Sequence, residues 1–500
     1  MWLFGGHDPA LLPDLGISQS WGAFPITQSC RTIGPAARAQ PRTTSGCVGV
    51  HPSSAADTPR AREVVRRQTA SDYRSNKALI LAARQHHCRG YGHLDALLQI
   101  AVEGVRVRLR RPLPKQASYP SNHPSASTCL GVLRANIRKE HALFHCIVVV
   151  TNIIDIWPEL FISPFDVVDK GDGDPRGVRR VTHDLSFPKD NYVNANTDPS
   201  GLPWSAFEHC SSVVREILRC KRKDQGRDVM VGDIASAYRN ACTNSECVYM
   251  FAWYIPGDNA IMIDMSATFG WTGSAGTYST LGGAVAFTHG SAGDGHHPSG
   301  FYNYHLLDDH VNVAADVGSR CGDIERSLRH AMTPVMDPTA VNDQKLTSWS
   351  THQKILGLIF DMKCGVMATP ASEISKAQQL VTQVFHASSL SRFSFRPLLG
   401  TLRNVATCVR PAQAFLQRLR VGERNVYQCS QVRVSETMRA DLLWWWHILS
   451  TSSLNGISLE YFDSLPEPDI IAVADATDAG ACAQPKNWLS HTSSRQTNSS

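Results

Sequence analysis

The alternation of apolar and polar positions is clearest in residues 301–317, FYNYHLLDDHVNVAADV. Aromatic and aliphatic residues precede the adjacent pair Asp308 and Asp309, and after the pair Val311 and Val313 alternate with polar or small residues. Such alternation, with β-branched and aromatic residues, predicts strands. The segment therefore predicts a β-hairpin with two carboxylates at its tip, although aspartates are also common in ordinary turns.

A second short apolar strand, residues 229–231, ends near Asp233 in the sequence VMVGDIASAY, 75 residues before Asp308. A single Asp at a strand end is most often a cap or turn residue. A strand with Asp followed by a strand with Asp-Asp is also the order that can place three carboxylates around two metal ions for phosphoryl transfer. Neighbouring carboxylates repel unless a cation joins them, and Mg²⁺ prefers such oxygen ligands.

A β-hairpin with basic arms is predicted upstream of these carboxylates. Residues 162–168 and 178–182 have strand character on either side of the turn-like run 171–175. Lys170 lies on one arm, and Arg179 and Arg180 lie on the other. These basic groups can hold a triphosphate, or they can be surface charges on an exposed hairpin.

A glycine-rich segment, residues 269–276 (FGWTGSAG), predicts a turn that enters a helix over 277–287. Gly282 and Gly283 fall inside this helix and weaken the prediction. Residues 289–300, HGSAGDGHHPSG, predict a solvated loop rather than a metal site, because their histidines lack ligand spacing.

Helical spacing predicts helices over 59–111, 373–388 and 394–409, the last stopped by Pro411. Residues 1–58 are rich in Gly, Pro, Ser, Thr and Ala and predict no packed structure. Residues 112–128 have the composition of a Pro/Ser linker. A chain of 500 residues is too long for a single core, so we expect several structural units.

Composition narrows the class of protein. Hydrophobic residues make up 42% and charged residues 19%, as in globular proteins, and the net charge is only +5. Residues 60–115 nevertheless hold thirteen Lys or Arg against four acids, which suits either a phosphate backbone or a solvated helix. The chain has fourteen cysteines without CxxC pairs, no long apolar run and no convincing signal peptide. These features predict an intracellular protein, cytoplasmic or nuclear, that is neither secreted nor embedded in a membrane.

Six motifs in order resemble those of a known family, the reverse transcriptases of retroelements. The match covers roughly residues 120–480 and is most similar to the DIRS-type group, which uses a tyrosine recombinase. The motifs are RRVTHDLSFPKDNYVN (179–194), GDIASAYRNA (232–241), FGWTGSAGTYS (269–279), LLDDHV (306–311), LGLIFD (356–361) and LLGTLRNVATCVRP (398–411).

The resemblance implies an α+β right-hand polymerase fold, with an antiparallel palm sheet, fingers and a helical thumb. It places fingers at 129–228, the palm with part of the fingers at 229–371, the thumb and connection at 372–450, and a truncated start of a ribonuclease H-like domain at 468–500. It leaves 1–58 unassigned and 59–128 as a basic helical region and linker.

The resemblance also assigns roles to residues. It implies that Asp233, Asp308 and Asp309, with the backbone carbonyl of Ile234, hold two Mg²⁺ ions, with Mn²⁺ as a possible substitute. It implies that Lys170 and Arg180 bind the triphosphate and that Tyr238 excludes a 2′-hydroxyl. It implies that Phe269 and Gly270 pack beneath the base pair and the incoming nucleotide, and that Leu356 and Gly357 form the primer grip. Asp475 would be the first carboxylate of a ribonuclease H site. The expected partners are an RNA or DNA template with its primer, and deoxyribonucleoside triphosphates.

The chain also departs from the family. Leu306 stands where relatives usually have an aromatic residue, and the acids that would complete a ribonuclease H site beyond Asp475 are missing, so we expect no such activity. Three alternatives stay open. The chain could be a decayed, non-catalytic relic that still binds nucleic acid, an RNA-dependent RNA polymerase, or a DNA-binding or capsid-like protein built on residues 60–115.

Overall fold

The computed structural model divides into two compact units, which are described separately. The first comprises residues 1–208 and 228–350, and the second 209–227 and 351–500. The structure describes residues 66–77, 79–169, 179–187, 192–203, 208–223, 228–233, 237–293, 295, 297–336, 341, 343, 346–426, 431–451, 455–463, 472–477 and 480–485. Within these residues, no helix is both long enough and apolar enough to cross a membrane.

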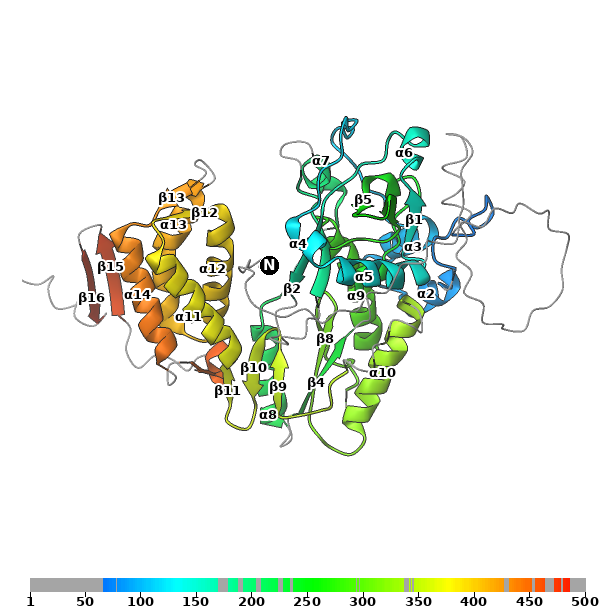
Figure 1. Cartoon of the computed structure of the whole chain (residues 1–500). Helices are drawn as coiled ribbons and strands as arrows, with labels where there is room; N and C mark the ends of the chain where they lie inside the picture. The colour runs from blue at the N-terminus through cyan, green and yellow to red at the C-terminus, as the bar shows by residue number, and fades with distance from the viewer. Residues whose placement is uncertain are drawn as a thin grey trace, which may run out of the picture. The chain divides into compact units, whose positions relative to one another are not determined.

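A three-stranded antiparallel sheet lies at the centre of the first unit (Figure 1). Its order is β4 (Asp228–Asp233), β8 (Asp309–Ala314) and β7 (Tyr304–Leu306). Val311 and Val313 of β8 are buried, as the alternation predicts. Leu306 pairs with Asp309, so only Leu307 and Asp308 form the turn, and the predicted hairpin is confirmed.

Two helices pack on this sheet. The first, α9 (Ser274–Ser291), contacts β7, and α10 (Arg320–Val335) contacts β4 and β8. Their apolar residues share one core, which includes Leu281, Val285 and Leu328. The predicted helix is therefore present, and it runs unbroken through its glycines.

The loop predicted to begin at residue 289 is wrong at its start, because α9 continues to Ser291. His289 is fully buried in this last turn. Its Nε2 lies 2.8 Å from Asn312 Oδ1, and its Nδ1 lies 2.9 Å from Ser327 Oγ. Partners on β8 and α10 thus satisfy a polar ring that sequence alone assigns to solvent.

A second sheet of the first unit has the order β1 (Cys146–Val150), β6 (Ala260–Asp264) and β5 (Ala252–Ile255). The predicted basic hairpin is confirmed by the antiparallel pairing of β2 (Phe165–Asp169) with β3 (Arg179–His183). The smaller helical elements around these strands are α5 (Leu130–Ala142), α6 (Ile153–Ile156), α7 (Val193–Asn196), η1 (Pro199–Gly201), η2 (Ala237–Asn240) and η3 (Val248–Met250).

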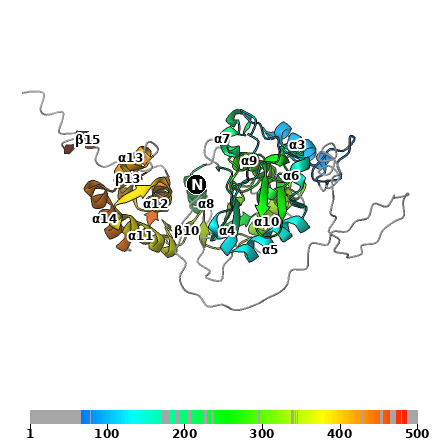
Figure 2. The same cartoon turned by 45° about the horizontal axis from the view of Figure 1, so that its top comes forward.

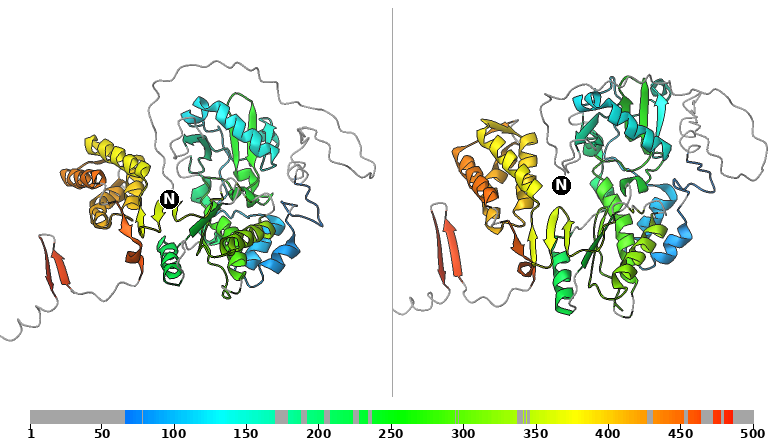
Figure 3. Two further views of the ribbon diagram at one scale, coloured as in Figure 1. Left: turned by 90° about the horizontal axis from the view of Figure 1, so that it is seen from below. Right: turned by 60° about the horizontal axis from the view of Figure 1, so that its bottom comes forward.

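The helix predicted over 59–111 is only partly correct. Within the described residues it consists of α2 (Leu81–His87) and α3 (Leu94–Glu103), which pack on α10 and α9 (Figure 3). The second helix ends because Gly104 has φ +79°, and a Cβ there would lie 2.9 Å from the backbone nitrogen of Asn244. Beyond it the chain is extended, and Val105 bridges to Thr243.

The prediction of a linker at 112–128 is wrong. Gln116 donates to the Ile162 carbonyl at 2.8 Å and accepts from the Ile162 amide at 2.7 Å. Asn122 makes the same pair of contacts, with the Tyr254 carbonyl at 2.9 Å and the Phe165 amide at 2.7 Å. Side-chain amides here take the place of a strand partner, and the segment ends in α4 (Pro124–Thr128), whose Ala126 is buried.

The second unit contains a helical bundle and small sheets. Its bundle, shown in Figure 2, is made of α11 (Ala371–His386), α12 (Arg392–Val405), α13 (Gln417–Val426) and α14 (Glu436–Ser450). The two helices predicted here are thereby confirmed, although α12 ends before residue 409. The other elements are α8 (Ser211–Lys223), β9 (His352–Ile355), β10 (Leu358–Asp361), β11 (Val366–Ala368), β12 (Ser389–Ser391), η5 (Arg410–Leu416), β13 (Gln431–Arg433), β14 (Ile457–Ser458), η7 (Leu459–Phe462), β15 (Ala472–Thr477) and β16 (Gly480–Pro485).

The structure confirms the α+β class with small antiparallel sheets. The domain limits and the right-hand arrangement stay predictions.

We predict that the basic region contributes to the core of the first unit instead of folding apart from it. Leu97→Ala empties a fully buried position on α3 and should lower the free energy of unfolding of the whole chain by about 2–5 kcal/mol. Val102→Ala is the control, because Val102 lies on the same helix and is 40% exposed. Chemical unfolding followed by circular dichroism measures both. Equal, small effects would show that α3 is not part of this core.

Candidate functional site

The register of β4 on β8 fixes the positions of two of the three candidate carboxylate residues. Asp233 is paired with Asp309, at the end of both strands. Directly opposed residues of an antiparallel pair lie on the same face of a sheet, with Cα atoms about 4.5–5.5 Å apart. Asp308 occupies the adjoining two-residue turn, and both Asp308 and Asp309 are half-buried.

The turn is supported from beneath by α9. A Cβ on Gly282 would lie 3.0 Å from the His305 ring and 3.2 Å from the carbonyl oxygen of Leu307. Leu307 itself has φ +55°, a left-handed conformation that costs a side-chain-bearing residue roughly 1–2 kcal/mol. The glycine thus allows the helix to lie directly against the turn that carries Asp308.

A layer of polar side chains lies under the carboxylates, and sequence reasoning missed it. The His305 and His310 rings stack at 5.6 Å, and His310 Nδ1 lies 3.2 Å from Asn303 Oδ1. Asn303 in turn donates to Asn312 at 3.2 Å. His310 and Asn312 alternate along β8 with Asp309 and Val311, so the only sequence signal was two polar residues on the inward side of a strand.

Burial shifts these histidines toward their neutral forms. Burial holds the pKa of His310 well below its usual value and lowers the pKa of His289 to about 4. Burial also lowers the pKa of His305. Burial therefore disfavours a positive charge in this layer.

An aromatic and basic cluster lies beside Asp308. The Tyr238 ring is 4.7 Å from the Phe269 ring, and the Arg180 guanidinium lies over the Phe269 face at 4.9 Å. Burial raises the pKa of Tyr238 to about 12, with a further rise from the negative charge of Asp308 and an opposing effect of Arg180. Arg180, Tyr238, Phe269 and Asp308, which come from four separate sequence motifs, thus lie close together. Tyr238 is only 5% exposed, so a ligand can meet only a small part of its surface.

Gly270 holds the Phe269 turn against β3. Its φ is +110°, and a Cβ would overlap the His183 carbonyl oxygen. The His183 amide donates to the Phe269 carbonyl at 3.4 Å. Because His183 lies three residues after Arg180, this contact also places Arg180 beside Phe269.

The other predicted site residues do not join this cluster. Lys170 and Ile234 lie outside the described residues. In the second unit, Leu356 and Gly357 form the β9–β10 turn with φ of +53° and +78°, as in a type I′ hairpin. Asp475 lies on β15, paired with Cys482.

Asp308 and Asp309 carry the chemistry that a divalent cation would need. Carboxylate oxygens are the ligands that Mg²⁺ prefers. Among the side chains that the structure describes, no three His, Cys, Asp or Glu residues gather as a metal site. The predicted set needs Asp233, of which only the backbone is described.

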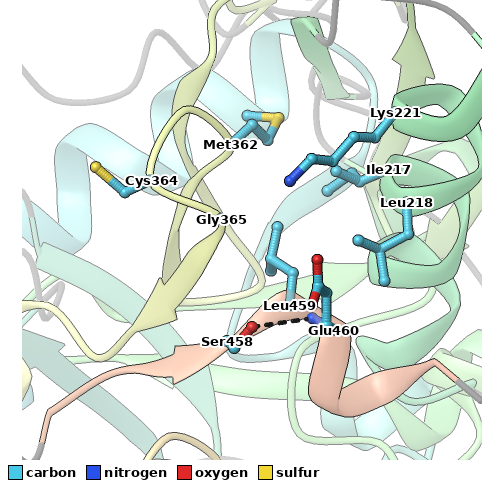
Figure 4. A pocket seen from close by; sticks show the side chains of 9 residues that line it. All are labelled: Ile217, Leu218, Lys221, Met362, Cys364, Gly365, Ser458, Leu459 and Glu460. Carbon is cyan, nitrogen blue, oxygen red and sulfur yellow. Dashed lines mark hydrogen bonds between the residues drawn. The ribbon is translucent and has the colours of Figure 1, made fainter. Parts of the chain in front are cut away.

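A pocket in the second unit is a weaker candidate (Figure 4). It lies between α8 and the β10–β11 turn, and its lining includes Lys221, Cys364 and Glu460. A hydrogen bond with Asp361 raises the pKa of the Cys364 thiol, so this thiol is not activated as a nucleophile. The pocket therefore offers no comparable chemistry.

Gly282 gives a direct test of the contact between α9 and the turn. Gly→Ala inside a helix normally stabilises by about 1 kcal/mol. We predict this gain for Gly290→Ala, whose Cβ would meet only the Phe301 carbonyl at an ordinary 3.6 Å. Gly282→Ala should instead lower stability by about 1–3 kcal/mol, because the methyl group presses on His305 and Leu307. Denaturant unfolding compares the two, and an equal gain for both would contradict the packing described.

The comparisons with known proteins differ in what they find. No protein-family model and no curated protein matches the chain. Among solved structures, the chain is similar to a foamy viral protease–reverse transcriptase in complex with double-stranded DNA, with a TM-score of 0.45 and 11% sequence identity over 82% of this chain. The chain spans 62% of that chain's length.

Proposed function

We propose that this chain is a reverse transcriptase of a retroelement, which extends a primer on an RNA or DNA template by nucleotidyl transfer. The observation that carries the proposal is the pairing of Asp233 with Asp309 beside the Asp308 turn, next to Tyr238, Phe269 and Arg180. The DIRS-type assignment is part of the proposal and rests on the sequence motifs alone.

In this proposal the carboxylates of Asp233, Asp308 and Asp309 hold the catalytic cations, with the backbone carbonyl of Ile234 as a further ligand. Ions held by these residues would supply Lewis-acid chemistry, lowering the pKa of the attacking 3′-hydroxyl and stabilising the negative charge of the leaving pyrophosphate. The protein positions the nucleotide for in-line attack.

Arg180 and Lys170 would bind the triphosphate in the same proposal. A guanidinium can bind phosphate oxygens through two parallel hydrogen bonds. Stacking on Phe269 fixes the plane of the Arg180 guanidinium before any ligand arrives, which reduces the entropy lost on binding.

In the arrangement that we propose, the fingers (129–228) and palm (229–371) fall mostly in the first unit. The thumb (372–450) falls in the second unit, which also contains residues 209–227 and 351–371. The β9–β10 turn with Leu356 and Gly357 would contact the primer end. Template, primer and deoxyribonucleoside triphosphates are the proposed partners. The main competing function is RNA synthesis on an RNA template, because such polymerases share the paired carboxylates, and Tyr238 discriminates between the two.

Asp308→Asn should abolish primer extension on a poly-rA template with Mg²⁺, while binding of the template–primer stays nearly unchanged. The substitution removes a ligand charge and no phosphate-contacting cation. Asp316→Asn is the control, because Asp316 is exposed just beyond β8. Extension and fluorescence anisotropy are measured on the same protein preparations. Undiminished synthesis by Asp308→Asn would contradict the assignment of Asp308 as a ligand of the catalytic cations.

Tyr238→Val should raise ribonucleotide incorporation relative to deoxyribonucleotide by roughly a hundredfold, because the ring no longer collides with a 2′-hydroxyl. Tyr238→Phe keeps the ring and should leave the ratio unchanged. The measurement is kcat/KM for each nucleotide in single-nucleotide extension. A wild-type protein that accepts both nucleotides equally would favour the RNA polymerase alternative.

A further inference from the structure

A buried cluster of charges lies directly behind Tyr238. The next residue, Arg239, has a side chain that is 10% exposed, and its Nη1 is paired with Asp264 Oδ1. Its Nε lies 3.2 Å from Glu140 Oε2. Asp264 is fully buried and Glu140 is nearly so, which makes this a charge network inside the first unit.

The cluster joins four elements of that unit. Arg239 belongs to η2, Asp264 ends β6, and Glu140 lies on α5. Asp264 Oδ2 is 3.5 Å from Nδ1 of His183, the last residue of β3. Burial holds the pKa of His183 well below its usual value and its Nδ1 is hydrogen-bonded to Thr268 Oγ1, so this is a packing contact rather than an ion pair. His145, which precedes β1, has its Nδ1 2.8 Å from Glu140 Oε2.

Arg239 is the central cation of this network. Burial raises the pKa of Asp264, and the Arg239 guanidinium opposes that rise. The guanidinium reaches two carboxylates through two different nitrogens, so its orientation is fixed from both sides. A fixed guanidinium also limits the freedom of the short 3₁₀ turn that carries it.

Both ends of the network lead to the candidate nucleotide site. Tyr238 is adjacent to Arg239 in the chain, and its ring contacts Phe269. His183 is stacked on Trp253 at 3.6 Å and lies three residues after Arg180, whose guanidinium covers Phe269. The network and the Tyr238–Phe269–Arg180 cluster thus form a closed loop of contacts.

We propose that Arg239 is a positioning residue for nucleotide selection. It holds Tyr238 at a fixed distance from Arg180, through Asp264 and His183, and thereby sets how strictly the site rejects a ribose. This inference rests on the proposed function, and it adds a residue that touches neither the nucleotide nor the metal ions.

A purely structural role makes a different prediction. In that case Arg239 contributes stability alone, and any substitution that costs the same stability affects nucleotide selection equally. Arg134 provides the comparison, because its Nε donates to Asp258 Oδ2 at 2.9 Å. This ion pair also lies in the first unit and is largely buried, because the Arg134 side chain is 16% exposed and the Asp258 side chain 13%.

The test compares Arg239→Met, Arg239→Lys and Arg134→Met in single-nucleotide extension. We expect Arg239→Met to lower the ratio of kcat/KM for deoxyribonucleotide over ribonucleotide by roughly tenfold to a hundredfold, mainly through KM. Arg239→Lys keeps one charge without the two-sided contact and should give an intermediate ratio. Arg134→Met should leave the ratio at the wild-type value.

Amide hydrogen exchange supplies a readout that needs no activity. Residues 237–241 and 268–270 should exchange faster in Arg239→Met than in the wild type, and Arg134→Met should not change them. If Arg239→Met does not fold, the double variant Arg239→Met with Asp264→Asn is used, because it also removes the buried charge of Asp264. Hydrogen exchange of Arg239→Lys is then measured as a further comparison.

The outcomes separate the two proposals. A wild-type protein without any extension activity would contradict the proposed function. In that case hydrogen exchange by itself tests whether Arg239 positions Tyr238. An unchanged nucleotide ratio and unchanged exchange in the folded Arg239 variants overturn the positioning role. An equal effect of Arg134→Met does so as well, because it would show that general destabilisation is sufficient.

Discussion

The pairing of β4 with β8 is the constraint on which the candidate site depends. Six consecutive residue pairs, from Asp228 with Ala314 to Asp233 with Asp309, set one register. A slip by a single residue would turn every side chain of one strand to the opposite face. It would turn Asp309, which shares a face with Val311 and Val313, toward the face of His310 and Asn312. The burial of Val311 and Val313 therefore stabilises the site as well as the core.

The two faces of this sheet differ in a way that favours ligand binding at the turn. Polar but uncharged groups lie inside, where a charged group would need a partner to offset its desolvation. Carboxylates lie at the open end of the strands. Burial disfavours the charged forms of the inner histidines, whereas Asp308 and Arg180 both lie close enough to Tyr238 to affect its pKa.

The sequence predicts correctly those helices and strands whose pattern of apolar and polar residues lies wholly within the element itself. The two hairpins at 165–183 and 304–314 follow from alternation, and the start of α9 follows from its glycine-rich turn. What could not be predicted depends on distant partners. His289 remains helical because Asn312 and Ser327 satisfy its ring. Similarly, the burial of Tyr238 beneath Phe269 depends on the close approach at Gly270, which no local pattern contains.

The basic segment shows why charge counts mislead in this chain. Arg66 donates to the Thr243 carbonyl at 2.6 Å and to Ser245 Oγ at 2.8 Å, and Arg84 is fully buried with a bond to the Val335 carbonyl. These guanidinium groups bind backbone oxygens inside the first unit, so they are not available to a phosphate backbone. A fork of five donors can satisfy several carbonyls at once, which a lysine cannot do. Two of the thirteen basic residues of 60–115 are thus bound inside the first unit, whereas Arg106, Arg108 and Arg110 are exposed. The charge count therefore overstates the surface charge of the segment only in part.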